Sequence, residues 1–262
     1  MPKSTEYAAK LPDDRGIIAY DAEEDAIWHD LIIRQMPEVR RHMARPYLDG
    51  LDQLNLPKTH VPQCVDVSAA LQRATGWQVA PVPALIPFGR FFAMLAAGCF
   101  PAASFIRKRK HFDYIEEPDI FHEIFGHTPL LTDARFAAFS RAIGLAGTRA
   151  DKADFQWLIR LYWFSIEFGL TVEDGVVKGL GSGLASSIAE LQWAVGAGPE
   201  RRPFDVIDIL RTPYRIDILQ PVYFVIDSLD QLFAAARRDL LADVATARSM
   251  GLHPPKYPPK AA

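Results

Sequence analysis

The 262-residue chain is poor in cysteine, with only Cys64 and Cys99. Two cysteines cannot build the framework of several disulfides that stabilises small secreted domains, and Cys99 lies in an apolar run typical of a buried, reduced thiol. The first residues, MPKSTEYAAKLPDD, contain no apolar segment of the kind that a secretory signal requires. We therefore expect a cytoplasmic protein without a disulfide scaffold.

The chain also lacks a long apolar run and an excess of charge of either sign. Between Arg90 and Arg107 the uncharged stretch is shorter than the roughly 20 residues that a membrane-spanning helix requires. Lys and Arg number 29 against 32 Asp and Glu, a net charge of -3. No overall field then attracts nucleic acid or an anionic membrane, and the basic cluster at 107–110 is more typical of a solvated loop.

Apolar residues, by contrast, are abundant, at 49% hydrophobic against 23% charged. This length and composition are sufficient to bury a sizeable core. No repeat, low-complexity tract or linker divides the chain, so we expect one domain over 1–262 with its core at about 22–250. The ends, 1–15 and 252–262, are expected to be loose tails, because the second is too rich in proline for a helix.

Helical periodicity dominates the chain. The pattern predicts an amphipathic helix at 22–43 that Pro37 interrupts, a short helix at 65–75 that Gly76 ends, and an apolar helix from about 90 to 97 after an extended segment at 79–87. The last helix is predicted to start at Ser228, where Gln231 completes a capping-box pattern, and to end at Gly251.

Strands are predicted to be few and short. Residues 170–178 indicate a hairpin with Asp174 and Gly175 in the turn. No alternation of strand and helix suggests a parallel sheet. The fold class expected is therefore mostly α, with short β-hairpins.

Candidate chemistry concentrates in EEPDIFHEIFGHTPLL, residues 116–131. Pro118 suits the first position of a helix that carries His122 and should fail near Gly126. Zinc proteases place two histidines four residues apart, whereas His127 follows His122 by five. On an ideal α-helix the two imidazoles would lie about 140° apart, so they converge on one ion only if the helix unwinds between them. The alternative is one surface histidine and one that caps the helix end.

A third element is the apolar segment FQWLIRLYWFSIEFGL, residues 155–170. It should be a buried helix, and within it only Arg160 and Glu167 are charged. A buried carboxylate is unfavourable unless it is paired or binds a metal. Its partner is therefore either Arg160, seven residues back on nearly the same face, or a cation shared with His122 and His127.

Two imidazoles and one carboxylate form the facial triad typical of non-haem Fe(II), which leaves coordination positions open for water, O2 or substrate. Asp119 lies one turn before His122 on the same face. It is predicted to accept a hydrogen bond from the ring nitrogen that does not bind the metal. The alternative role of Asp119 is charge complementarity at the helix N-terminus.

Four motifs together carry a resemblance to a known family: EPDIFHEIFGHTPLL, LYWFSIEFGL, GSGLASSIAELQ and TPYRIDILQPVYFV. In sequence and order they resemble the pterin-dependent aromatic amino acid hydroxylases, particularly their bacterial phenylalanine-hydroxylating members. The similarity extends from about Val82 to Val225. It implies the catalytic domain of that family, with Fe(II) bound by His122, His127 and Glu167 and a tetrahydropterin as co-substrate.

The resemblance also implies contacts for the pterin and the amino acid. Phe91 is similar to the residue that stacks on the pterin ring, with Leu85 and Ile86 beside it, although ordinary core packing would also explain Phe91. Arg107 is similar to the arginine that binds the substrate carboxylate, a role suited to its bidentate fork. Other implied substrate contacts are Pro118, Trp163, Gly183 and Ser186.

Two positions favour phenylalanine as the substrate. Tryptophan hydroxylases usually carry Phe where this chain has Trp163, and tyrosine hydroxylases tend to carry an acidic residue where it has Ile216. The resemblance thus implies conversion of L-phenylalanine to L-tyrosine with O2, with one oxygen atom passing to the ring and the other to the pterin. We expect a monomer, because no long C-terminal heptad helix is present.

Three alternatives remain open at this stage. The same chemistry could act on L-tryptophan or another aromatic amino acid. A zinc hydrolase would use His122, Glu123 and His127, although the five-residue spacing argues against it. A non-catalytic protein would bind metal or pterin without forming a product.

Overall fold

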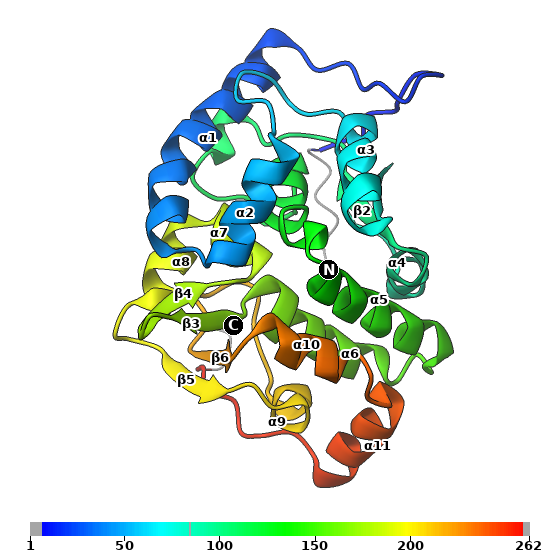
Figure 1. Ribbon diagram of the computed structural model, residues 1–262, viewed down its shortest axis with the longest axis vertical. Coiled ribbons are helices and arrows are strands. Elements are labelled where there is room, and N and C mark those ends of the chain that lie inside the picture. The colour runs from blue at the N-terminus through cyan, green and yellow to red at the C-terminus, as the bar shows by residue number, and fades with distance from the viewer. Residues whose placement is uncertain (1–6, 84, 259–262) are drawn as a thin grey trace.

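Helices make up most of the computed structural model, which describes residues 7–83 and 85–258 (Figure 1). In Figure 1, α1 and α2 lie on the left, α3 and α4 lie on the right, and α5 and α6 cross the middle. To the left of α5 and α6, beneath α1 and α2, lies a small sheet, and α9 and α11 lie lowest. Within the described residues no helix combines the length and the apolar character needed to cross a membrane.

Helix α1 (Ala22–His42) begins at a complete capping box, in which the Asp21 side chain accepts from the backbone of Glu24 and the Glu24 side chain accepts from that of Asp21. The predicted interruption at Pro37 is wrong, because the helix continues through it. Leu31 before the proline and Val39 after it are both fully buried. Packing on both sides of Pro37 therefore offsets the backbone hydrogen bond that the proline cannot make.

Ten further α-helices follow in the part of the chain that the structure describes. α3 confirms the predicted end at Gly76, whose φ of 77° is the left-handed conformation of a helix C-cap. α4 confirms the predicted apolar helix, starting two residues earlier. Their bounds are α2 (Arg45–Leu54), α3 (Cys64–Thr75), α4 (Phe88–Ala96), α5 (Ala134–Arg149), α6 (Phe155–Tyr162), α7 (Ser182–Ser186), α8 (Ile188–Val195), α9 (Val206–Arg211), α10 (Leu229–Ala235) and α11 (Leu240–Met250).

The C-terminal helix was predicted as one element but is two, α10 and α11. Ser228 makes no side-chain capping bond, and Gln231 accepts instead from the backbone N–H of Asp227. A new start lies at Asp239, whose carboxylate accepts from the backbone N–H groups of Leu241 and Ala242. The apolar residues keep their helical spacing across this break, so the spacing does not predict it.

The strands form two small sheets. β1 (Gln78–Val82) pairs in parallel with β2 (Cys99–Ala103), and the larger sheet has the order β4 (Val176–Gly179), β3 (Leu170–Glu173), β6 (Val222–Ile226), β5 (Glu200–Pro203). The predicted β3–β4 hairpin is confirmed, with both turn residues, Asp174 and Gly175, at positive φ. The expectation of no parallel pairing is wrong, since β3–β6 and β5–β6 are also parallel.

Two π-helices and two short 3-10 turns lie at the centre of the chain. They are η2 (Phe121–His127), η4 (Trp163–Glu167), η1 (Arg109–His111) and η3 (Leu130–Thr132). The predicted helix at 155–170 starts as α6 and widens into η4, where the backbone N–H of Phe168 donates to the carbonyl of Trp163, five residues back, at 2.9 Å.

Both ends of the described chain are attached to the rest, which differs from the expected loose tails. Tyr7 stacks on Phe105 with ring centroids 4.5 Å apart, and the Lys10 backbone N–H donates to the Ser104 hydroxyl. The His253 backbone N–H donates to the carbonyl of Arg211 at 2.8 Å. These contacts to distant segments hold both ends in place, although neither end is helical. Residues 1–6 and 259–262 lie outside the described part.

The two candidate caps of the last segment give a matched test. Asp239→Ala should lower the free energy of unfolding by about 1 kcal/mol, because two N–H groups of α11 lose their acceptor. Ser228→Ala should change it by much less, because that side chain makes no capping bond. Urea unfolding followed by circular dichroism measures both, and equal losses would contradict the assignment of the caps.

Candidate functional site

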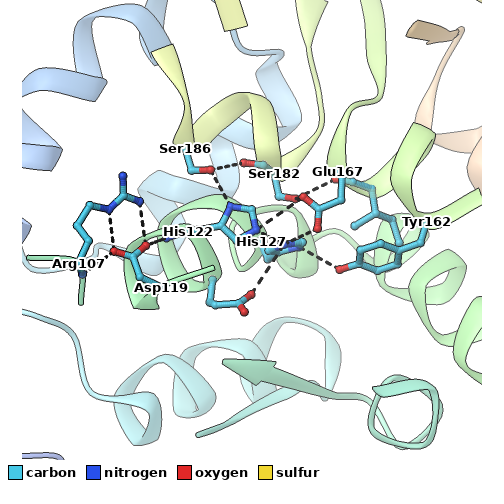
Figure 2. Close-up of polar contacts among 10 residues, drawn as sticks. Arg107, Asp119, His122, His127, Tyr162, Glu167, Ser182 and Ser186 are labelled. Atoms are coloured by element: carbon cyan, nitrogen blue, oxygen red, sulfur yellow. Dashed lines mark hydrogen bonds and ion pairs between the residues drawn. The ribbon is translucent and has the colours of Figure 1, made fainter. Parts of the chain in front are cut away.

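Three side chains converge at the middle of the molecule: His122 and His127 from η2 and Glu167 from the end of η4 (Figure 2). The two histidine Nε2 atoms are 3.2 Å apart. Glu167 Oε1 lies 3.0 Å from His127 Nε2, and its Oε2 lies 3.7 Å from His122 Nε2. The structure thus brings together the three residues that the sequence predicts as metal ligands.

The π-helical turn of η2 explains how histidines five residues apart can meet. Its i to i+5 hydrogen bonds widen the turn, so that residues five apart lie on one face. The expected unwinding of the α-helix between the two histidines takes the form of this wider turn, which stays helical across Gly126 and ends at His127. Gly126 has another role: a Cβ there would come within 2.9 Å of the Ser182 carbonyl oxygen. The glycine lets α7 approach η2 at backbone distance.

The ring nitrogens that face away from this centre contact hydroxyl groups, and for His122 this contact defines the tautomer. The Ser186 hydroxyl donates to the Ser182 carbonyl at 3.1 Å and lies 2.8 Å from His122 Nδ1, so it accepts the Nδ1 proton. His127 Nδ1 lies 3.3 Å from the Tyr162 hydroxyl. With the proton of His122 on Nδ1, the Nε2 lone pair of that ring faces the Glu167 carboxylate, an arrangement that a bound cation stabilises.

The donor atoms fit an octahedral divalent metal. Ligand atoms at about 2.1 Å from an ion are about 3 Å apart when they occupy neighbouring octahedral positions. The observed separations of 3.0, 3.2 and 3.7 Å match this spacing on one face of the ion. His122, His127 and Glu167 could therefore hold a metal and leave its opposite face open.

The charge states also suit a metal. Burial lowers the pKa of His122 to about 4, so its imidazole is neutral at ordinary pH. Burial opposes ionisation of Glu167, but the charge of His127 and hydrogen bonds from His127 and Ser182 outweigh it and lower the pKa of that carboxyl to about 2. An ionised carboxylate beside a neutral imidazole is the state that binds divalent cations.

Helix α7 braces two of the three residues. The Ser182 hydroxyl donates to Glu167 Oε2 at 2.9 Å, and Ser186 holds His122. Gly183 permits this packing, because a Cβ there would lie 2.8 Å from the ring of Phe168. The resemblance implies a substrate contact for Ser186. In the structure its hydroxyl is bonded to His122 and to the Ser182 carbonyl within α7. Ser182 was missed, although it lies in the same GSGLASS motif.

Asp119 contacts the metal residue His122, but through different atoms than predicted. Its carboxylate accepts from the backbone N–H of His122, whereas the imidazole Nδ1 goes to Ser186. The predicted ring contact is wrong because Arg107 occupies the carboxylate instead: Nε donates to Oδ2 at 2.8 Å and Nη2 to Oδ1 at 2.9 Å. Asp119 is fully buried and Arg107 is 5% exposed, so the solvated-loop interpretation is wrong for Arg107.

The pair is mutually stabilising. Burial disfavours both charges, but each is outweighed by the partner: the pKa of Arg107 is raised by Asp119, and the pKa of Asp119 is lowered by Arg107. The guanidinium is thereby fixed beside η2, the helix that carries both histidines (Figure 2).

Aromatic rings line the side of His127 opposite Arg107. Tyr162 contacts Phe91 edge-to-face with ring centroids 5.1 Å apart, so the predicted pterin residue connects through Tyr162 to His127. Leu85 is 57% exposed and Ile86 is half-buried, both on the segment leading into α4. Tyr162 was missed in the sequence, although it precedes Glu167 by five residues, the spacing of one π-helical face.

Glu123 is a second carboxyl near the centre. Its Oε2 lies 4.0 Å from His127 Nε2, farther than Glu167, although it shares a potential metal cluster with His122 and His127. Burial, and then the charge of Glu167, raise the pKa of Glu123 well above its usual value. The five-residue spacing of His122 and His127 differs from the four-residue spacing of the zinc proteases.

The remaining predicted substrate residues are Trp163 and Pro118. Trp163 is half-buried and stacks on Tyr214 with centroids 4.4 Å apart. Pro118 is half-buried and lies just before the helical turn at Ile120, not at its first position as predicted. Both flank the segments that carry the metal residues.

Comparison with known proteins assigns the class. A family profile described as biopterin-dependent aromatic amino acid hydroxylase matches residues 4–244. The chain therefore belongs to the biopterin-dependent aromatic amino acid hydroxylase family, and its mostly helical fold is the catalytic fold of that family.

Individual relatives are similar to this chain over nearly its whole length. The phenylalanine-4-hydroxylase of Vibrio cholerae is 48% identical over 257 residues, covering 98% of this chain and 89% of that one. The apo structure of the cold-active phenylalanine hydroxylase from Colwellia psychrerythraea 34H has a TM-score of 0.94 at 45% identity, covering 98% of this chain and 100% of that one. Chromobacterium violaceum phenylalanine hydroxylase with bound Fe(III) has a TM-score of 0.88 at 35% identity, covering 96% and 92%.

The Ser182 bond predicts an effect on metal affinity. Ser182→Ala should weaken Fe(II) or Co(II) binding by about 10- to 100-fold, because Glu167 Oε2 loses the donor that orients the carboxylate. Calorimetric titration of the metal-free protein measures the affinity. Ser140→Ala is the matched control, since that buried hydroxyl donates to the Phe136 carbonyl at 3.0 Å. Equal affinities in both variants would refute the orienting role.

The Arg107–Asp119 pair predicts an effect on stability. Asp119→Asn should lower the free energy of unfolding by about 3–5 kcal/mol, because it leaves the Arg107 charge buried without its counter-charge. Chemical denaturation measures this loss. The exposed pair Arg45–Asp49 provides the control, and Asp49→Asn should change the free energy by less than about 1 kcal/mol.

Proposed function

We propose that this chain is a phenylalanine 4-monooxygenase, which uses Fe(II), a tetrahydropterin and O2 to convert L-phenylalanine to L-tyrosine. The observation that carries the proposal is the convergence of His122, His127 and Glu167 at the separations of neighbouring octahedral ligands, inside the fold of a biopterin-dependent hydroxylase family. A metal held on one face keeps its other positions for the reactants.

The iron, when bound, supplies the activation of O2 that the side chains cannot provide, with the pterin as the electron donor. The chain supplies position and exclusion of water. His122 presents an unprotonated Nε2 because Ser186 accepts its Nδ1 proton, and Tyr162 lies 3.3 Å from the Nδ1 of His127 and orients that ring. Glu167 adds the negative charge that favours a divalent ion.

Arg107 is proposed to bind the carboxylate of the amino acid. Asp119 accepts from Nε and Nη2, one edge of the guanidinium. The end-on edge, formed by Nη1 and Nη2, is a second edge with the geometry that a carboxylate fits. Asp119 thus orients the arginine, and its bond to the backbone of His122 relates that orientation to the metal.

The aromatic residues are proposed to bind the two rings. Phe91, on α4, is assigned to the pterin, with Leu85 and Ile86 on the segment before it. Trp163, one π-helical turn from Glu167, is assigned to the substrate ring, together with Pro118 and Gly183. Relatives that are named phenylalanine-4-hydroxylase support phenylalanine over tryptophan as the substrate.

We further propose that residues 1–262 act as one catalytic domain in a cytoplasmic monomer. The motifs for the single site span more than half of the chain, which supports one domain. Size-exclusion chromatography with light scattering tests the monomer.

The activity predicts a defined set of requirements. Purified protein with Fe(II), a tetrahydropterin and O2 should form L-tyrosine from L-phenylalanine, and His122→Ala should lower the rate by at least about 1000-fold, because one of three metal ligands is lost. Chromatographic detection of tyrosine measures this. The exposed His60→Ala is the control and should retain full activity.

Other outcomes would select the alternatives. Zn-dependent turnover without pterin would indicate a hydrolase, and binding of pterin or metal without product would indicate a non-catalytic protein. Preferential turnover of L-tryptophan or L-tyrosine would keep the chemistry and reject the substrate. Activity of His122→Ala at the wild-type rate would reject the metal site itself.

A further inference from the structure

The indole of Trp163 is held by three neighbours, one of which lies 57 residues away in the chain. Its ring stacks on Tyr214 at 4.4 Å and contacts Phe168 at 4.5 Å. Its Nε1–H donates to Oε1 of Gln220 at 3.2 Å. The orientation of this ring, which belongs to η4, therefore depends on a residue outside η2, η4 and α7.

Both the oxygen and the nitrogen of the Gln220 side-chain amide form hydrogen bonds. Its Nε2 donates to the carbonyl of Arg215 at 2.8 Å and to that of Ile218 at 3.0 Å. With both N–H groups directed at carbonyls, Oε1 is the atom that must face the indole N–H. One side chain thus closes the 215–219 loop and joins it to Trp163.

The backbone of Gln220 is also anchored, from the opposite side. Its N–H donates to Glu190 Oε1 at 2.9 Å, and its carbonyl accepts from Trp193 Nε1 at 2.8 Å, both on α8. Gln220 is 1% exposed. Its position is set by α8, and the amide transmits that position to the loop and the indole together.

The 215–219 loop is partly exposed and carries its own ion pair. Ile216 and Leu219 are each 44% exposed. Arg215 pairs with Asp217 inside the loop and donates to the carbonyl of Pro258. The Gln220 amide and the stacking of Tyr214 on Trp163 are two contacts that connect this loop and its flank to a residue of η4, the helix that ends at Glu167.

We propose that Gln220 is a specificity-positioning residue: its amide holds the 215–219 loop, with Ile216, at a set distance from Trp163, and so determines which aromatic ring fits between the loop and the indole. The inference rests on the proposed function, because Trp163 and Ile216 matter only if an aromatic amino acid binds beside them. Gln220 does not touch the substrate and acts through these two neighbours.

The principal test is Gln220→Met, which keeps the length of the side chain and removes its donors and its acceptor. The kcat/KM for phenylalanine relative to tryptophan should fall by about tenfold, since the loss of hydrogen bonds of ordinary strength releases the Trp163 indole and the 215–219 loop. Gln63→Met is the matched control, because Gln63 joins the backbone of Ile18 through both ends of its amide, away from Trp163. The control should leave the ratio unchanged.

A second measurement does not depend on catalysis. Trypsin should cleave after Arg215 several-fold faster in Gln220→Met than in the wild type or in Gln63→Met, because the loop carbonyls have lost their donor. If Gln220→Met does not fold, Gln220→Glu replaces it; this variant keeps an acceptor for the indole, lacks the amide donors, and should show the same faster cleavage.

A double-mutant cycle with Trp163→Phe tests the route of the effect. Phe lacks the indole N–H, so the effects of Trp163→Phe and Gln220→Met on the substrate ratio should be smaller together than their sum. Additive effects, or an unchanged ratio and unchanged cleavage in Gln220→Met, would overturn the inference. An inactive wild type would instead overturn the proposed function, and the cleavage result would still report whether Gln220 holds the loop.

Discussion

Burial of the Glu167 carboxylate governs the arrangement around it. A negative charge inside an apolar core must be compensated, and here two imidazoles and one hydroxyl surround it. His122 and His127 meet that requirement only on a π-helical turn, and Ser182 reaches the carboxylate only because glycines let α7 approach at backbone distance. Helix type, glycine positions and serine contacts all follow from where this charge lies.

The metal residues and the substrate side are connected through shared anchors. Asp119 binds both the backbone of His122 and the guanidinium of Arg107, so the proposed carboxylate site is registered to the metal site. Gln220 does the same for the aromatic side, joining the 215–219 loop to Trp163 on the helix that ends at Glu167. Orientation in this enzyme family member is therefore built from buried polar contacts between distant segments, which hold geometry because their alternatives are unsatisfied.

Local patterns predicted the elements whose signals are local. The end of α3 at Gly76 and the hairpin turn at Asp174 and Gly175 depend on backbone conformations that few residues adopt, and both are confirmed. The continuous α1 and the parallel strands were not predicted, because packing across Pro37 and pairing between β3 and β6 involve residues far apart in the chain. Apolar periodicity likewise passes through the break before Asp239, since it reports the buried face and not the backbone bonds.

The residue types of the site follow from the sequence alone: two histidines in one short segment and one carboxylate in an apolar helix favour metal binding, with Arg160 left open as the partner of Glu167. The partners of those residues do not. Only the folded chain decides that Ser186 bonds the His122 ring, that Asp119 pairs with Arg107, and that Gln220 accepts from the Trp163 indole. The reason is geometric, because a hydrogen bond forms within a few tenths of an ångström or not at all, and segments some 60 residues apart reach that accuracy only when the whole core is packed.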